Sequence, residues 1–195
     1  MKNILYFIVL IGVTFSSKSQ SLIIDATVYK KGIYRTFEEF KYNTPSIEFK
    51  YKTITKERGY GFMNTGGQVT YYLIDIDRKL GKTIGKVFGF CDGKNIYINQ
   101  YLQKLSPKRY FIKIDYLGKY CYYEDISCTT TPNGGSGCSL SKRIMDINTG
   151  EIIHLTKYTL RKLIAKNTEL LKAFNEEPKK SKKIKQYTIQ HIKTL

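Results

Sequence analysis

The sequence contains no tryptophan and only two histidines, and these shortages limit the binding sites that it can form. The lack of tryptophan weakens a sugar-binding interpretation, although seventeen tyrosines could stack against sugar rings instead. His154 and His191 stand alone, because no second histidine lies at the H-x₃₋₅-H spacing and no two cysteines lie at the C-x₂₋₄-C spacing of zinc sites. We therefore expect no metal site and no cofactor.

Acidic residues are scarce as well. The chain has 16 aspartates and glutamates against 33 lysines and arginines, which gives a formal net charge of +17 at pH 7. A field of this size favours anionic partners and long-range steering, but it says nothing about the fold. The alternative explanation is a lysine-rich surface that serves no partner.

The few carboxylates form no recognisable catalytic pair. Glu38 and Glu39 are adjacent, so on a helix their side chains point about 100° apart and cannot face one another. Glycoside hydrolysis needs two carboxylates about 5 to 9.5 Å apart, a distance that the sequence cannot supply. No pattern selects any two of the six further candidates, which are Asp75, Asp77, Asp92, Asp115, Glu124 and Asp125. A hydrolase with an unrecognised site is therefore the second functional interpretation, and whether the chain is an enzyme stays open.

Apolar runs are short, and the longest one lies at the N-terminus. The chain starts with Lys2 and an apolar run over residues 4–15, after which Ser17 and Ser19 stand where small residues precede a cleavage site. The run is about a dozen residues, short of the roughly 20 that a membrane-spanning helix needs. We predict a cleaved signal peptide over residues 1–19, and a buried N-terminal strand is the alternative.

Cleavage would leave residues 20–195 as one exported, soluble domain whose charge is +15, because Lys2 and Lys18 are removed. No cysteine follows the apolar run, so a lipoprotein acceptor is missing, and no later segment is apolar enough to span a membrane. We expect the protein in the periplasm or outside the cell. There the anionic partners to consider are a glycan, the membrane surface or an envelope protein, and the compartment disfavours nucleic acid.

The four cysteines permit two disulfides in an exported chain, with three possible connectivities. The pair nearest in sequence, Cys128 and Cys138, brackets the glycine-rich segment TTTPNGGSG, which a disulfide would staple. The alternative is a set of free, partly buried thiols. The states of Cys91 and Cys121 stay open under either interpretation.

Hydrophobic patterns predict strands over most of the chain up to residue 155. A β-branched run predicts a first strand at 22–29, alternation predicts a half-buried strand at 47–53, and an apolar run predicts a central strand at 68–76. Three turns flanked by apolar runs predict hairpins, at Asp92-Gly93, Leu117-Gly118-Lys119 and Asn148-Thr149-Gly150. Consecutive short strands with tight turns are typical of an antiparallel meander.

The pattern changes to helical spacing after Thr156. Apolar residues recur mostly every three or four positions, which predicts one amphipathic helix over 156–175. Pro178 ends it, and a second, looser helix follows. We therefore expect an α+β fold: a bent antiparallel β-sheet meander or partly open barrel, with a short N-terminal helix and C-terminal helices. Residues 20–155 would be mainly β and residues 156–195 helical, within one domain.

The short N-terminal helix is predicted by its capping residues. Thr36 can accept a hydrogen bond at the helix start while Glu39, three residues on, reaches back to the cap. Phe37 and Phe40 lie on one face, and Pro45 ends the helix because the residue before a proline avoids helical geometry. About two turns of helix cannot persist alone in water, so these aromatic rings must pack against other elements.

Two blocks of sequence stand out together. One is GIYxTFEEFKxNxPS, whose structural motif residues are Gly32, Tyr34, Thr36, Phe37, Glu39, Phe40 and Pro45. The other is VFGFCDGKNIYIN at residues 87–99. In these blocks, and in its lysine-rich end, the chain resembles a family of exported Bacteroidota proteins of unknown function. The resemblance spans nearly the whole mature chain; it implies export and a β-rich fold, and it supplies no catalytic residue.

A basic cluster near the C-terminus is the candidate binding patch. It comprises Lys179, Lys180, Lys182, Lys183 and Lys185. Such a cluster could bind anionic lipid headgroups or glycan, and the alternative is a solvated hinge between two helices. Since no catalytic motif is evident, we interpret the chain as a non-enzymatic envelope module that binds an anionic or protein partner.

Overall fold

The computed structural model describes residues 22–99, 104–130 and 136–195. The predicted signal peptide, residues 1–19, lies outside this part of the chain. In chain order the elements are the 3-10 helix η1 (Ile23–Asp25), β1 (Gly32–Tyr34), α1 (Phe37–Lys41), β2 (Thr53–Tyr60), the 3-10 helix η2 (Phe62–Asn64), β3 (Gly67–Ile74), α2 (Arg78–Ile84), β4 (Gly89–Cys91), β5 (Ile96–Ile98), β6 (Ile112–Lys113), β7 (Tyr120–Thr130), β8 (Ser136–Asp146), β9 (Ile152–His154), α3 (Lys157–Leu163), α4 (Thr168–Glu176) and α5 (Lys180–Lys193).

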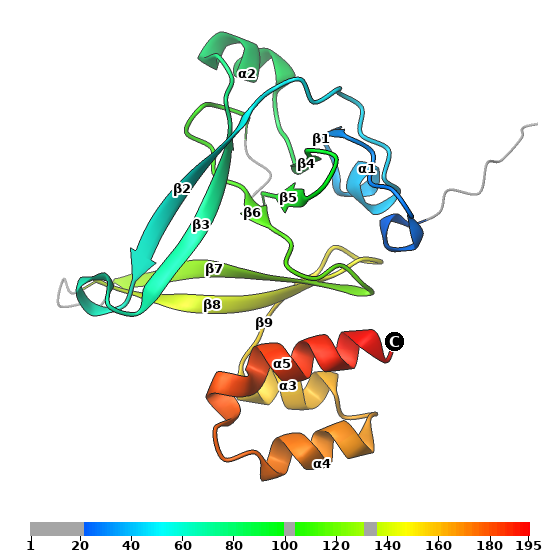
Figure 1. Ribbon diagram of the computed structural model, residues 1–195, viewed down its shortest axis with the longest axis vertical. Helices are drawn as coiled ribbons and strands as arrows, with labels where there is room; N and C mark the ends of the chain where they lie inside the picture. Colours follow the sequence, from blue (N-terminus) through cyan, green and yellow to red (C-terminus); the bar gives the residue numbers. More distant parts are fainter. Residues whose placement is uncertain (1–21, 100–103, 131–135) are drawn as a thin grey trace, which may run out of the picture.

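The predicted α+β fold is confirmed, since the described residues form five α-helices and three antiparallel sheets and no closed barrel. The first sheet has the strand order β1-β4-β5-β6, the second pairs β2 with β3, and the third has the order β7-β8-β9. In Figure 1 the first two sheets lie above β7 and β8, and α3, α4 and α5 lie below them. No helix in the described part of the chain is long and apolar enough to cross a membrane.

The strand predicted at 22–29 is wrong, because this segment contains η1 and no strand. The first strand is β1, which begins at Gly32 and pairs with β4. A Cβ on Gly32 would overlap the Pro45 ring and stand 2.9 Å from the Ile47 carbonyl oxygen. Glycine therefore lets the segment after α1 approach β1, and the backbone N–H of Ile33 donates to that same carbonyl at 2.7 Å.

Helix α1 is confirmed, with one change in its cap. The Thr36 hydroxyl accepts from the backbone N–H of Glu39 at 3.1 Å, as predicted. The Glu39 carboxylate accepts from the backbone N–H of Arg35 at 2.7 Å, one residue before the expected partner. Phe40 is fully buried, and its ring centroid lies 5.3 Å from that of Phe88. Aromatic packing thus holds a helix that is only five residues long.

Two of the three predicted hairpins are confirmed. β4 pairs with β5 across the Asp-Gly turn, and β8 pairs with β9 across the Asn-Thr-Gly turn. Around the remaining turn, Leu117-Gly118-Lys119, an isolated bridge joins Tyr116 and Tyr122 in place of a hairpin. The reason is that β6 pairs with β5, whereas β7 pairs with β8.

Two long ribbons are the most extended elements. β2 and β3 pair over eight residues and β7 and β8 over eleven. Their ends meet, because the backbone N–H of Gly61, which follows β2, donates to the carbonyl of Cys138 in β8 at 2.8 Å. In Figure 1 the tip of the β2–β3 ribbon accordingly reaches one end of β7 and β8.

The C-terminal segment is helical, but the single helix predicted over 156–175 is wrong. It is divided into α3 and α4 by a turn around Ile164. Asn167 starts the new helix, because its side chain accepts a hydrogen bond from the backbone N–H of Leu170 at 3.0 Å. The break turns α4 back along α3, and α5 then packs against both.

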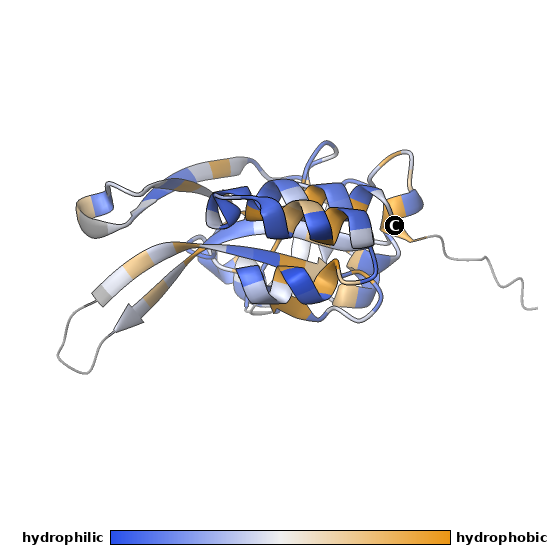
Figure 2. Ribbon diagram, turned by 90° about the horizontal axis from the view of Figure 1, so that it is seen from below, coloured by the Kyte–Doolittle hydropathy of each residue, from blue (hydrophilic) through white to orange (hydrophobic). Residues whose placement is uncertain are grey.

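The helices share one core with the sheet above them. Leu160 and Phe174 are fully buried in it, together with Tyr122 and Ile144 from the third sheet. Leu160, Phe174 and Ile184 of the three helices therefore face inward. Hydrophilic and hydrophobic residues alternate around these helices in Figure 2. This inward packing leaves their polar residues for the surface.

Candidate functional site

The structure divides the predicted lysine cluster. Of its five members, Lys179 and Lys182 are exposed at the start of α5. Lys180 Nζ donates to a backbone carbonyl of the preceding turn at 2.8 Å, and Lys183 Nζ donates to the side-chain oxygen of Gln186 at 3.1 Å. The cluster also lies at a helix N-terminus, where the helix dipole opposes positive charge. It therefore provides a smaller exposed patch than the sequence predicts.

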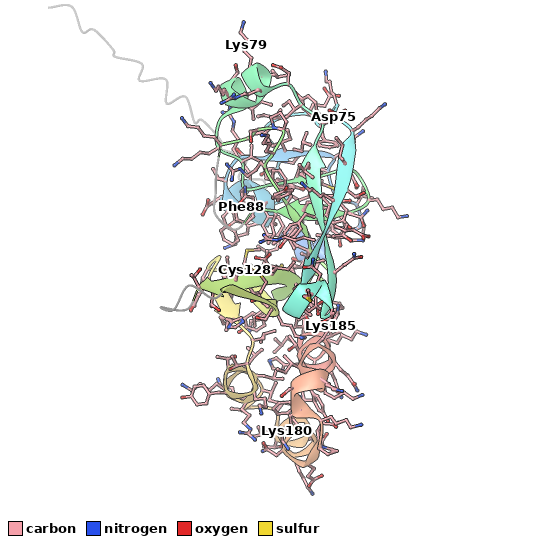
Figure 3. All side chains as sticks on the ribbon, turned by 90° about the vertical axis from the view of Figure 1, so that its left-hand side faces the viewer. Asp75, Lys79, Phe88, Cys128, Lys180 and Lys185 are labelled. Carbon is pink, nitrogen blue, oxygen red and sulfur yellow. A yellow bond between two sulfur atoms is a disulfide. The ribbon has the colours of Figure 1, made fainter. Side chains whose placement is uncertain are left out.

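Lys185 points to the sheet and ties α5 to two carboxylates. Its Nζ lies 2.8 Å from Asp115 Oδ2 and 3.6 Å from Glu124 Oε1. The Tyr122 hydroxyl also donates to Glu124, at 2.6 Å. Burial disfavours the charged ammonium, but the hydrogen bond and charge of Asp115, together with Glu124, outweigh burial and raise the pKa of Lys185. In Figure 3 Lys185 accordingly lies where the helices meet the sheets.

Asp115 and Glu124 are the two candidate carboxylates that a single cation brings together. They line a groove of about 190 Å³ with residues of β3 and β6. A hydrolase would need one of them to activate water or donate a proton. Lys185 contacts both carboxylates and thereby joins α5 to β7 and to the segment before it.

The other four candidate carboxylates lie elsewhere: Asp75 is exposed after β3, Asp77 caps α2, Asp92 closes the β4–β5 turn, and Asp125 is buried against Tyr71. Burial alone would raise the pKa of Asp92. Hydrogen bonds from the backbone N–H groups of Asn95 and Lys94 and from the Tyr97 hydroxyl outweigh burial, so the pKa of Asp92 is lowered. These contacts are those of a structural turn.

The two free cysteines and the buried histidine lack the features of an activated nucleophile. Burial raises the pKa of Cys121 to about 12 and also raises the pKa of Cys91. Burial, with the charge of Lys119, lowers the pKa of His191. In residues 22–99, 104–130 and 136–195, no three side chains of histidine, cysteine, aspartate or glutamate are grouped to hold a metal ion.

The predicted cysteine pair and the sequence block that begins at Gly32 both form part of the folded framework. Cys128 and Cys138 form a disulfide between directly opposed residues of β7 and β8, and residues 131–135 of the loop lie outside the described chain. The block that begins at Gly32 forms β1, α1 and the turn after it. Its Tyr34 ring is fully buried.

A more exposed basic surface lies on α3. Residues 156–195 contain eleven lysines and arginines and three glutamates, a net charge of +8 in this segment. Between α3 and α4 lies a shallow groove of about 570 Å³. It is lined by Tyr158, Arg161, Lys162, Ala165, Leu171 and Asn175.

Tyr158 is the aromatic centre of this α3–α4 groove. Its side chain is 64% exposed, and Lys162 Nζ stands 4.4 Å from the centroid of its ring. Arg161 Nε donates to Asn175 Oδ1 at 3.0 Å, which holds the guanidinium at the groove and links the two helices. The groove thus combines two cations, an exposed ring and a small apolar floor.

The chain is matched over residues 32–195 by the model of DUF6563, a family of unknown function. The chain belongs to this family. The DUF6563 match begins at Gly32, the first residue of β1, and continues past the end of α5. No curated protein and no solved structure gave a match. Because the function of DUF6563 is unknown, membership assigns no activity to the residues described above.

The groove is a feature of this DUF6563 chain that sequence reasoning missed. Tyr158 fits the apolar stripe of a continuous helix over 156–175, so the pattern predicts that it is buried. A signal was present nonetheless, since Tyr158, Arg161 and Lys162 stand at positions i, i+3 and i+4 and therefore share one helix face. Their position beside a break in the helix could not be seen from that spacing.

Proposed function

We propose that the protein is a non-enzymatic binding module of the cell envelope, and that its helical end attaches to an anionic membrane surface. The observation that carries the proposal is the α3–α4 groove, where the exposed Tyr158 lies beside Arg161 and Lys162. The proposal keeps the exported location expected from the N-terminal signal peptide.

Charge provides the attraction to such a surface. Each lysine or arginine close to an anionic membrane contributes about 1 kcal/mol, and the effect decays within a Debye length of roughly 8 to 10 Å. The segment 156–195 carries a net charge of +8, so the helical end has more positive charge than contact with a few headgroups requires. Tyrosine rings favour the interface between headgroups and acyl chains, where Tyr158 would lie.

The groove fits headgroups better than sugar rings. Lys162 already stands over one face of the Tyr158 ring, so a sugar cannot stack on that face. The groove is also shallow and open, which suits a flat lipid surface. The helices form one end of the longest axis of the molecule, opposite to α2, so this end can meet a membrane without obstruction by the sheets (Figure 1).

The test is sedimentation of the exported protein with vesicles of phosphatidylglycerol and phosphatidylcholine, or of phosphatidylcholine alone. We expect binding to the anionic vesicles only, with a loss of affinity at high salt. Lys166 is exposed in the turn that follows α3. The triple variant Arg161→Gln, Lys162→Gln, Lys166→Gln should lower the affinity by about tenfold or more, because three positive charges leave this end of the molecule.

The matched control is Arg78→Gln, Lys79→Gln, Lys82→Gln on α2, which removes the same charge at the opposite end, as the positions of Lys79 and Lys180 in Figure 3 show. It should retain most of the affinity. Equal losses in the two triple variants would mean that total charge alone drives binding. Retention on heparin without binding to vesicles would replace the membrane by an anionic glycan.

A further inference from the structure

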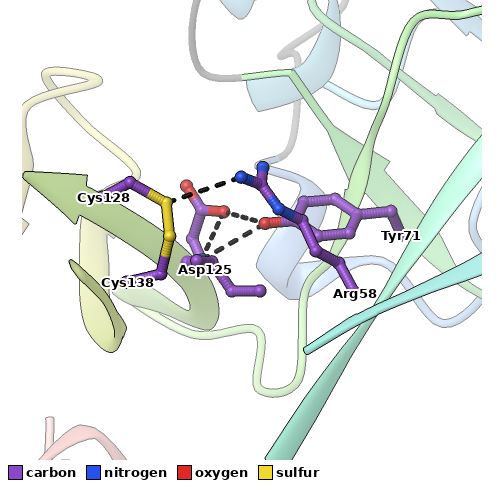
Figure 4. Close-up of a disulfide and its surroundings, with 6 residues drawn as sticks. Arg58, Tyr71, Asp125, Cys128 and Cys138 are labelled. Atoms are coloured by element: carbon purple, nitrogen blue, oxygen red, sulfur yellow. Dashed lines mark hydrogen bonds between the residues drawn. A yellow bond between two sulfur atoms is a disulfide. The ribbon is translucent and has the colours of Figure 1, made fainter. Parts of the chain in front are cut away.

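The Cys128–Cys138 disulfide lies at an exposed junction of the two long ribbons. Cys128 is exposed and Cys138 is half-buried. Arg58, which comes from β2, reaches across to this disulfide, and its Nη2 donates to Cys128 Sγ at 3.5 Å (Figure 4). The contact places a positive charge beside the sulfur of Cys128.

We propose that this disulfide is a thiol–disulfide exchange site, which accepts electrons from a dithiol reductant and releases Cys128 as the leaving thiolate. A neighbouring cation stabilises a thiolate. A thiol whose thiolate is better stabilised leaves faster when its partner sulfur is attacked. Arg58 contacts Cys128 Sγ, so the contact directs attack to Cys138 Sγ.

The carboxylate of Asp125 lies near the junction and has partners other than the sulfur. The Asp125 carboxylate accepts from the Tyr71 hydroxyl and from the backbone N–H of Ile126, both at 2.7 Å. Its second oxygen lies 4.0 Å from the guanidinium of Arg143. Asp125 therefore has its own partners, and Figure 4 shows Arg58 directed to the sulfur instead.

The exchange balances with a dithiol as the reductant. A thiolate of the dithiol attacks Cys138 Sγ, the bond between the two cysteine sulfurs breaks, and Cys128 leaves as a thiolate beside Arg58. The second thiol of the reductant then attacks the first sulfur of the reductant, which is bonded to Cys138 Sγ in the mixed disulfide. This step releases Cys138. The reductant becomes a disulfide, and the two electrons and two protons that it gives up leave both cysteines as thiols.

Neither of the two free cysteines is placed to reduce this disulfide, so the electrons must come from a separate dithiol. Cys91 and Cys121 are buried, and burial raises the pKa of both thiols. The exchange also affects the contact between the ribbons, because the carbonyl of Cys138 accepts from the backbone N–H of Gly61. Reduction removes a crosslink from the strand to which the β2–β3 tip is bound.

The test is the rate at which dithiothreitol reduces this disulfide in the folded, full-length exported protein. Arg58→Gln should slow reduction by about threefold or more, because the leaving thiolate loses its cation. Arg58→Lys should restore part of the rate. Lys56→Gln is the matched control, since it removes one charge from an exposed side chain of the same strand and should keep the wild-type rate.

A second measurement locates the attacked sulfur. Brief treatment with the monothiol N-acetylcysteine, followed by alkylation and peptide mapping, should place the adduct on Cys138, and Arg58→Gln should lose this preference. The proposal is overturned if Arg58→Gln is reduced as fast as the control. Adducts spread equally over both cysteines in the wild type, or a disulfide that resists reduction until the protein unfolds, would overturn it as well.

Discussion

Gly32 and Gly137 are both strand glycines with very different surroundings. A Cβ on Gly32 in β1 would overlap the Pro45 ring and stand 2.9 Å from the Ile47 carbonyl oxygen. A Cβ on Gly137 in β8 would meet no atom of the described residues within 4 Å. At the residue scale, therefore, β1 requires glycine because another segment packs against its backbone, whereas β8 has room for a side chain.

We predict that Gly32→Ala destabilises the fold by about 1 to 3 kcal/mol, because an added methyl group in a filled space forces the backbone to shift. Gly137→Ala should be neutral or stabilise slightly, since alanine restricts the unfolded chain more than glycine does. Urea unfolding of both variants, followed by circular dichroism, measures the difference. A similar midpoint for the two variants would contradict this account of Gly32.

Predictions at this scale succeed where the cause is local. The cap that Thr36 provides depends on residues within three positions, and the structure confirms it. The need for glycine at position 32 could not be predicted, because its cause, Pro45, stands thirteen positions away and meets Gly32 only in the fold. A local pattern contains no information about such an approach.

At the scale of elements, the Lys185 contact explains how α5 is attached to the sheet. Lys185 Nζ contacts Asp115, which precedes β7, and Glu124 within it, while the Tyr122 ring lies 5.2 Å from the same nitrogen. Two carboxylates and one ammonium therefore join a helix to a strand. Loss of the ammonium would leave two like charges close together.

We predict that Lys185→Gln lowers the free energy of unfolding by about 1 kcal/mol at pH 7, a value limited by partial exposure of the contact. The pKa of Lys185 is raised in the folded state, so its stabilising contribution is complete at neutral pH and is lost only as the pH rises above 10.5 and through the raised value. The wild-type and variant stabilities should therefore converge only in strong alkali. Lys183→Gln, which loses one exposed hydrogen bond, is the control and should behave as wild type.

The elements also show where sequence patterns stop being sufficient. The helical spacing after Thr156 identifies the helices correctly, but it cannot show that Asn167 caps a new helix and turns it back. That turn removes Tyr158 from the predicted apolar stripe and leaves it exposed in the groove. The groove thus forms because the chain turns back between α3 and α4. The periodicity of a single helix does not predict such a turn.

At the scale of the whole molecule, the β-rich and helical parts share a core. Tyr122 and Ile144 of the third sheet are fully buried in a cluster with Leu160 and Phe174 of the helices. Removal of the helices would expose these sheet residues to water. A shared core of this kind is expected of one cooperative domain and not of two independent ones.

We predict that residues 20–195 unfold in a single transition, in which tyrosine fluorescence and far-ultraviolet circular dichroism coincide. A chain that ends at residue 155 should not fold, because the buried face of the third sheet loses its cover, and we expect it to aggregate or to bind hydrophobic dyes. The triple variant of Arg161, Lys162 and Lys166 is the control, since it changes exposed residues of the same C-terminal segment and should keep the single transition. Cooperative unfolding of the shortened chain would show that the sheets form a domain of their own, to which the helices are only attached.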